Sequence, residues 1–159
     1  MPAPEEPVEN NRNDPMQAEI HAALRERFRS FLNDDARFRK FIRACNEFFY
    51  TSRELRYWQQ QEWDIFIKEY PEYATLSVPA IRDAFHVCHV HLDPLKQVEV
   101  PIHKGVRDIY YAPEAERARS ENAPYSQEFS LDSEYCGNRT HITTSCCDKC
   151  LAWWKAYGR

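Results

Sequence analysis

Two short pairs of metal-ligating residues constrain this chain more than any other feature of its sequence. Cys88 and His91 lie in the segment "FHVCHVHLDPL", and Cys147 and Cys150 lie in "TSCCDKCLAWW", with two residues inside each pair. Such a gap lets a tight turn direct both side chains at one ion, and zinc prefers four tetrahedral ligands drawn from thiolate sulfur and imidazole nitrogen. The spacing therefore predicts one structural Zn²⁺ ion bound by Cys88, His91, Cys147 and Cys150, provided that folding brings the two distant pairs together.

Three neighbouring residues are alternative ligands. Cys136 is the main rival, because the glycine that follows it permits a tight turn close to a metal. Cys146 adjoins one predicted ligand, and His89 lies between the two ligands of the first pair, where it would point away from their ion. Since a structural zinc site closes at four ligands, we expect Cys136 to be a buried thiol and His89 to be solvated or hydrogen-bonded.

Six cysteines could instead form disulfides in a secreted protein. The N-terminal segment "MPAPEEPVENN" lacks the basic and apolar regions of a signal peptide, and no apolar run is long enough to span a membrane. We therefore expect a soluble, cytoplasmic protein in which clustered Cys and His bind metal. Cys45, which lies apart on an apolar helical stripe, is expected to be a small buried hydrophobe.

The composition also limits the partners. The net charge of −4 and the pI near 5.9 provide no basic excess that would attract nucleic acid or an anionic membrane. No glycine-rich phosphate-binding loop and no serine nucleophile motif occur in the sequence. A protein partner is therefore favoured over nucleic acid, a membrane or a nucleotide.

The first half of the chain predicts helices. Residues 1–15 form an acidic, Pro-rich segment that we expect to be a disordered tail, and residues 16–159 a single domain with a helical part, 16–86, and a zinc-stabilised part, 87–159. Apolar residues recurring at steps of three and four predict three long helices and a short fourth one. The third is expected to start at a capping box, Thr51 and Glu54, and the fourth at Ser77 and Pro79. The expected buried face of the third helix consists of Leu55, Trp58, Ile65 and Phe66.

The second half predicts a mixture of strands and helix. The runs "VEVPIH" and "RDIYYA" flank Lys104 and Gly105, which favours a β-hairpin. Propensity does not decide whether residues 113–130 contain a helical turn or a long loop. The C-terminal "CLAWWKAYGR" predicts a helix that begins near the second Cys pair. The predicted fold class is therefore α+β, with an N-terminal helical bundle followed by a zinc module.

Residues 85–154 resemble short, uncharacterised bacterial zinc-knuckle proteins. The resemblance is carried by Cys88, His91, the segment "VPIHKG" at 100–105, Cys136 before a glycine, and the closing Cys147 and Cys150 before a helix. It covers less than half of the chain and leaves the helical part unmatched. It implies a treble-clef-like or ribbon-like zinc site, and it names no activity.

A site with three cysteines and one histidine leaves no open position for water or substrate, so we expect it to build structure. The protein would then act as a protein-binding module, for example a bacterial accessory or toxin-neutralising (immunity-type) protein, and we predict no catalytic residues. Exposed residues of the helices would contact the partner: Arg39, Tyr57 and Gln61. The alternative is a metal-dependent nuclease that uses His103, Asn138 and His141, which the absence of a positive field disfavours.

Overall fold

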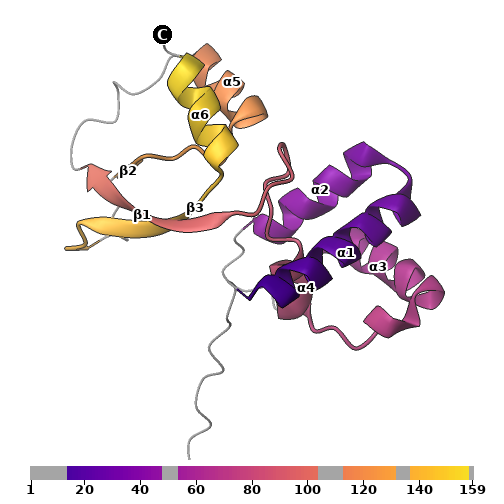
Figure 1. The fold of residues 1–159 in the computed structure, drawn as a ribbon. Coiled ribbons are helices and arrows are strands. Elements are labelled where there is room, and N and C mark those ends of the chain that lie inside the picture. Colours follow the sequence, from indigo (N-terminus) through magenta and orange to yellow (C-terminus); the bar gives the residue numbers. More distant parts are fainter. Residues whose placement is uncertain (1–13, 48–53, 104–112, 132–136, 158–159) are drawn as a thin grey trace, which may run out of the picture. The chain divides into compact units, whose positions relative to one another are not determined.

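The computed structural model describes residues 14–47, 54–103, 113–131 and 137–157 (Figure 1). The chain is α+β and divides into two compact units. The first unit comprises the described residues within Met1–Phe38 and Tyr50–Phe85, and the second those within Arg39–Phe49 and His86–Arg159. Among the described helices, none combines the length and apolar character that crossing a bilayer requires.

The first unit is helical, and local signals set its helix ends. Helix α1 (Pro15–Leu32) begins after Asp14, whose carboxylate accepts a hydrogen bond from the Met16 N–H, and it ends at Asn33 in the left-handed conformation. Helix α4 (Val78–Ala84) begins after Ser77, whose hydroxyl accepts from the Ala80 N–H, as predicted. Between them lie α3 (Tyr57–Glu69) and a 3₁₀ turn, η1 (Pro71–Tyr73). The first turn of α2 (Asp35–Asn46) also belongs to this unit.

Aromatic rings form the core of the first unit around Phe28, which is fully buried. Its ring centroid lies 5.0 Å from that of Phe66, 5.4 Å from that of Phe85 and 5.8 Å from that of Trp63. Ring pairs at these separations add favourable edge-to-face contacts to the burial of apolar area. Side chains of α1, of α3 and of the residue that follows α4 therefore meet at one ring, and Trp63 was not among the residues predicted to be buried.

The third helix differs from its prediction. It begins at Tyr57, and the side chain of Gln59 accepts the Arg56 N–H, so the role assigned to Glu54 belongs to Gln59. Leu55 is buried but precedes the helix, so it does not fix the helix phase. As a result Ile65, predicted to be buried, is 57% exposed, and the buried positions of α3 are Gln59, Trp63 and Phe66.

The second unit combines the rest of α2 with a small sheet and two helices. Strand β1 (Lys96–His103) pairs antiparallel with β3 (His141–Cys146), from Lys96 opposite Cys146 to Pro101 opposite His141. Strand β2 (Ser130–Leu131) pairs parallel with the end of β1, which gives the order β2-β1-β3. The helices are α5 (Pro113–Asn122) and α6 (Asp148–Tyr157).

Two predictions about this half have different outcomes. Residues 113–122 form a helix, which answers the question that propensity left open. Of the predicted hairpin, "VEVPIH" lies in β1, whereas "RDIYYA" at 107–112 lies outside the described residues. In the described part of the chain, the antiparallel partner of β1 is β3, far along the sequence.

We expect Phe28→Ala to lower the free energy of unfolding by about 3–5 kcal/mol, because it removes a fully buried ring and leaves a cavity among other rings. The matched control is Met16→Ala on the same helix, which removes a side chain that is 70% exposed and should change stability by less than about 0.5 kcal/mol. Chemical denaturation of both variants measures the difference. Equal stabilities would contradict the placement of the core.

Candidate metal centre

The first ligand pair lies on a backbone knuckle that follows α4 in the sequence. The Cys88 N–H donates to the Asp93 carbonyl and the Leu92 N–H donates to the Cys88 carbonyl, both at 2.8 Å. The chain turns back at Leu92, which has a φ of 61°. The His91 N–H points at the Cys88 sulfur, 3.4 Å away. These contacts hold Cys88 and His91 on the same side of the turn.

The second pair lies where β3 passes into α6. Cys147 directly precedes the helix and accepts the Leu151 N–H through its carbonyl, and Cys150 is in the first helical turn. Hydrogen bonds from the backbone N–H groups of Cys150 and Lys149, in the first turn of the helix, favour the thiolate form of Cys147. An ion pair between Lys149 and Asp93, 2.9 Å, joins the start of this helix to the knuckle.

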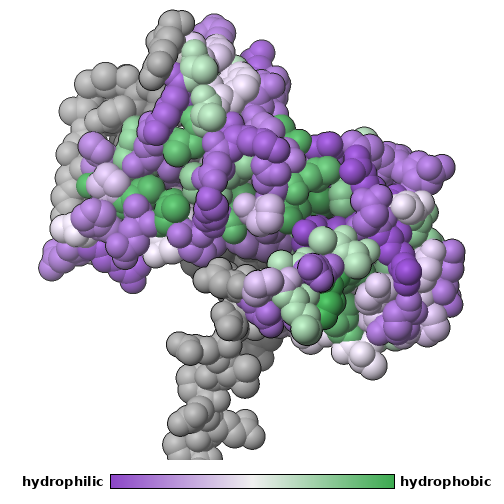
Figure 2. Space-filling view, in the orientation of Figure 1, coloured by the Kyte–Doolittle hydropathy of each residue, from purple (hydrophilic) through white to green (hydrophobic). Residues whose placement is uncertain are grey.

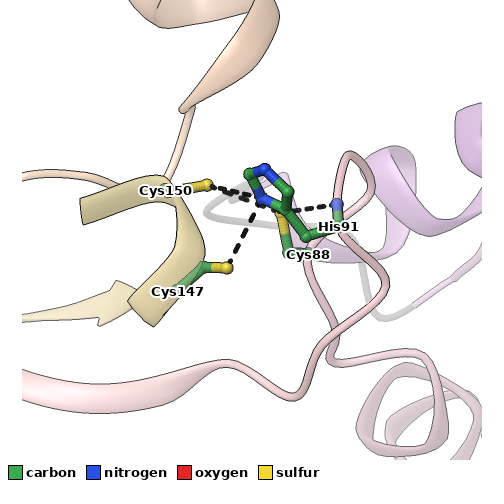
Figure 3. A group of neighbouring side chains, drawn as sticks. All are labelled: Cys88, His91, Cys147 and Cys150. Carbon is green, nitrogen blue, oxygen red and sulfur yellow. Dashed lines mark hydrogen bonds between the residues drawn. The ribbon is translucent and has the colours of Figure 1, made fainter. Parts of the chain in front are cut away.

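The four side chains converge (Figure 3). One ligand atom from each of Cys88, His91, Cys147 and Cys150 lies within 4.8 Å of the others. The Nδ1 atom of His91 lies 3.6, 3.7 and 3.3 Å from the sulfurs of Cys88, Cys147 and Cys150, respectively, and the sulfurs of Cys88 and Cys150 are 3.6 Å apart. The two pairs are therefore close enough to bind one metal ion.

Apolar side chains surround the cluster. The three cysteines are fully buried, and His91 is half-buried. Leu95 and Ala123 are buried against the thiols, and partly buried apolar side chains pack on the same cluster: Val90, Tyr125, Trp153 and Trp154. The Cys147 N–H donates to the Tyr125 carbonyl at 3.0 Å, which ties the loop after α5 to the site.

Hydrogen bonding divides the thiols into two kinds. The hydrogen bond from Cys150 lowers the pKa of Cys88 to about 4, against the opposing effect of burial. The same bond, together with burial, raises the pKa of Cys150, and burial raises that of Cys147. A cation in this place would make all three sulfurs thiolates, the form in which cysteine binds metal.

The alternative ligands have other surroundings. His89 directs Nδ1 to the Tyr125 hydroxyl at 3.3 Å, and burial lowers the pKa of its imidazole. Cys146 is buried at the end of β3 and lies outside the cluster, as does Cys45 on α2. Cys136 lies outside the described residues. Within the described residues, the four predicted ligands are the one group that could hold a metal ion.

The residues of the nuclease hypothesis do not form a cluster of potential ligands within the described residues. His103 is exposed at the end of β1, where its ring contacts Phe129, and His141 is exposed at the start of β3, where Nδ1 lies 2.9 Å from the Thr140 hydroxyl. Asn138 is exposed in the turn before β3. In the described part of the chain, none of the three belongs to a group of potential metal ligands.

Two contacts of the site were not predicted. The guanidinium of Arg39 donates to the carbonyls of His89 and Val90, and the side-chain amide of Asn46 donates to the Val87 carbonyl. Arg39, predicted to contact a partner, is half-buried. No local sequence pattern predicts these hydrogen bonds, because they join residues 41 to 51 positions apart in the chain.

Comparison of the chain with protein-family models, with curated proteins and with solved structures found no match.

We expect protein purified without chelator to contain one metal ion per chain, and Cys150→Ser to lose it. The free energy of unfolding should fall by several kcal/mol, because the binding free energy of such a site is folding free energy. Elemental analysis and thermal unfolding measure both effects.

Cys146→Ser is the matched control, since it alters the adjacent buried thiol outside the cluster. It should keep the metal. A wild-type protein without metal, or with a disulfide between Cys88 and Cys147, would contradict the site, as would equal metal loss in the two variants.

Proposed function

We propose that the cluster binds one structural Zn²⁺ ion and that the protein is a zinc-stabilised protein-binding module. The observation that carries the proposal is the convergence of three buried cysteines and one histidine on a single point. Such a set fills the tetrahedral coordination of zinc and leaves no position for water or substrate. The centre then serves folding, and the activity lies on the surface.

Distances and ligand chemistry support zinc. With bonds of about 2.3 Å to sulfur and about 2.0–2.1 Å to nitrogen, tetrahedral edges are about 3.8 Å between sulfurs and about 3.6 Å between sulfur and nitrogen. Here the sulfurs of Cys88 and Cys150 are 3.6 Å apart, the His91 nitrogen lies 3.3 to 3.7 Å from the three sulfurs, and all four ligand atoms lie within 4.8 Å of one another. Thiolate and imidazole ligands do not suit magnesium or calcium, which prefer oxygen.

An exposed stripe on α3 supports a protein partner. Tyr57, Gln61 and Ile65 are spaced four residues apart, so they follow one side of the helix, and we call them the α3 stripe. Tyr57 is 80% exposed and Ile65 57% exposed, and Gln61 donates to the Tyr57 hydroxyl at 3.0 Å. The visible surface is mainly hydrophilic, with several hydrophobic areas (Figure 2).

This stripe contains two of the residues predicted to contact a partner. Exposed tyrosine provides a large rigid contact area with a polar end, which suits a protein interface. We propose that an apolar side chain of the partner packs between Tyr57 and Ile65 while polar groups bind Gln61. A toxin-neutralising role in bacteria remains a prediction from the sequence alone.

A photo-crosslinking experiment tests the surface. A photoreactive phenylalanine analogue in place of Gln61 should give an adduct of one defined mass in native lysate, and Tyr57→Ala with Ile65→Ala should abolish it. The same analogue in place of Glu26, which is exposed on α1, is the positional control and should give no adduct.

A nuclease assay with magnesium or manganese provides the opposing outcome. Under the module hypothesis His103→Ala leaves the adduct intact and no metal-dependent cleavage occurs. Cleavage of nucleic acid that His103→Ala abolishes, together with no adduct at Gln61, would overturn the module in favour of the nuclease.

A further inference from the structure

Two side chains of α2 hold the backbone that carries the first ligand pair. The Arg39 guanidinium donates to the His89 carbonyl at 2.9 Å and also to the Val90 carbonyl, and the Asn46 amide donates to the Val87 carbonyl at 2.8 Å. The two residues are seven positions apart, two helical turns, so they lie on the same face of α2. Both belong to the second unit, as does the knuckle.

These bonds account for most of the carbonyls of the knuckle. Of the four consecutive carbonyls of residues 87–90, the second accepts the Leu92 N–H and the other three accept from α2. The segment between the ligands has neither a helical nor a sheet ladder of its own, so α2 supplies the partners that regular structure would supply elsewhere. The backbone conformation that directs Cys88 and His91 to the same point is thus stabilised by hydrogen bonds from α2.

Helix α2 is itself well packed. Phe41, Ile42, Ala44 and Cys45 are all buried, with exposed fractions of 8% or less. The Asn46 side chain also bonds within its helix, to the Ile42 carbonyl at 3.1 Å, and its oxygen lies 3.1 Å from Nδ1 of His86. The donors that hold the knuckle therefore project from a fixed surface.

Charge adds to the fit. A Zn²⁺ ion with three thiolates and a neutral imidazole carries one net negative charge. Arg39 places a fixed positive charge on the peptide groups that join two of the ligands, and its planar guanidinium reaches two carbonyls at once. A lysine would bring the charge without the two-pronged geometry.

We propose that Arg39 and Asn46 are positioning residues of the metal centre, and that α2 and the ion stabilise each other. This inference rests on the proposed zinc site. Since coupling between two events is reciprocal, an ion that orders the knuckle also orders the last turns of α2, and a helix that holds the knuckle slows loss of the ion. Arg39 then serves the centre in addition to any contact with a partner.

Zinc release from the full-length, zinc-loaded protein tests the coupling. Transfer of zinc to an excess of a chromogenic chelator should be about tenfold or more faster for Arg39→Met and Asn46→Leu than for the wild type, in the range found for residues that support metal ligands. Arg39→Lys should fall between. The control is Arg43→Met on the same helix, where Arg43 is 63% exposed and ion-paired with Glu47, and its release rate should stay within about twofold.

Amide hydrogen exchange in α2 provides the second readout. A substitution that disturbed only the knuckle would not change how zinc affects exchange in this helix. In the wild type, zinc should slow exchange of the amides of residues 42–47, and in Arg39→Met that slowing should largely disappear. A metal-binding wild type whose release rate and α2 exchange are unaffected by Arg39→Met would overturn the positioning role alone. A wild type that binds no zinc would overturn the metal centre, and the positioning role with it.

Discussion

The feature on which the account of the second unit depends is the convergence of three buried sulfurs and an imidazole, which lie close enough to bind one metal ion. Cys88, Cys147 and Cys150 are fully buried, and burying a charge without a partner costs several kcal/mol. A bound cation changes this balance, because it supplies the opposite charge at the centre of the cluster. It also cross-links the knuckle after α4 to the start of α6, two segments that have no strand pairing between their ligands.

The two units obtain stability in different ways. The first has a core of aromatic side chains that pack around Phe28. The second has a sheet in which β2 is only two residues long, and the three cysteines of the metal centre belong to one of its buried clusters. A metal ion bound at that cluster would add its binding free energy to the free energy of folding. The hydrogen bonds of Arg39 and Asn46 then connect this local centre to a helix with its own buried face.

Spacing alone predicted the four clustered side chains, because a two-residue gap is a property of the local turn. Helix ends were predictable where a side chain caps its own turn, as at Ser77. The buried face of α3 was predicted wrongly at Ile65. The prediction counted Leu55 as part of the helix, whereas this buried residue precedes it. The pairing of β1 with β3 and the contact of Arg39 with the knuckle join distant parts of the chain, and single-sequence patterns carry no record of such contacts.

X-ray absorption at the zinc edge of the purified protein tests the central claim most directly. The fine structure should fit three sulfur neighbours at about 2.3 Å and one nitrogen neighbour at about 2.0–2.1 Å, with multiple scattering from a single imidazole. Cys146→Ser should leave that spectrum unchanged, and Cys88→Ser, like Cys150→Ser, should lose the ion. A shell dominated by oxygen, or one with a water in the fourth position, would contradict a closed structural centre.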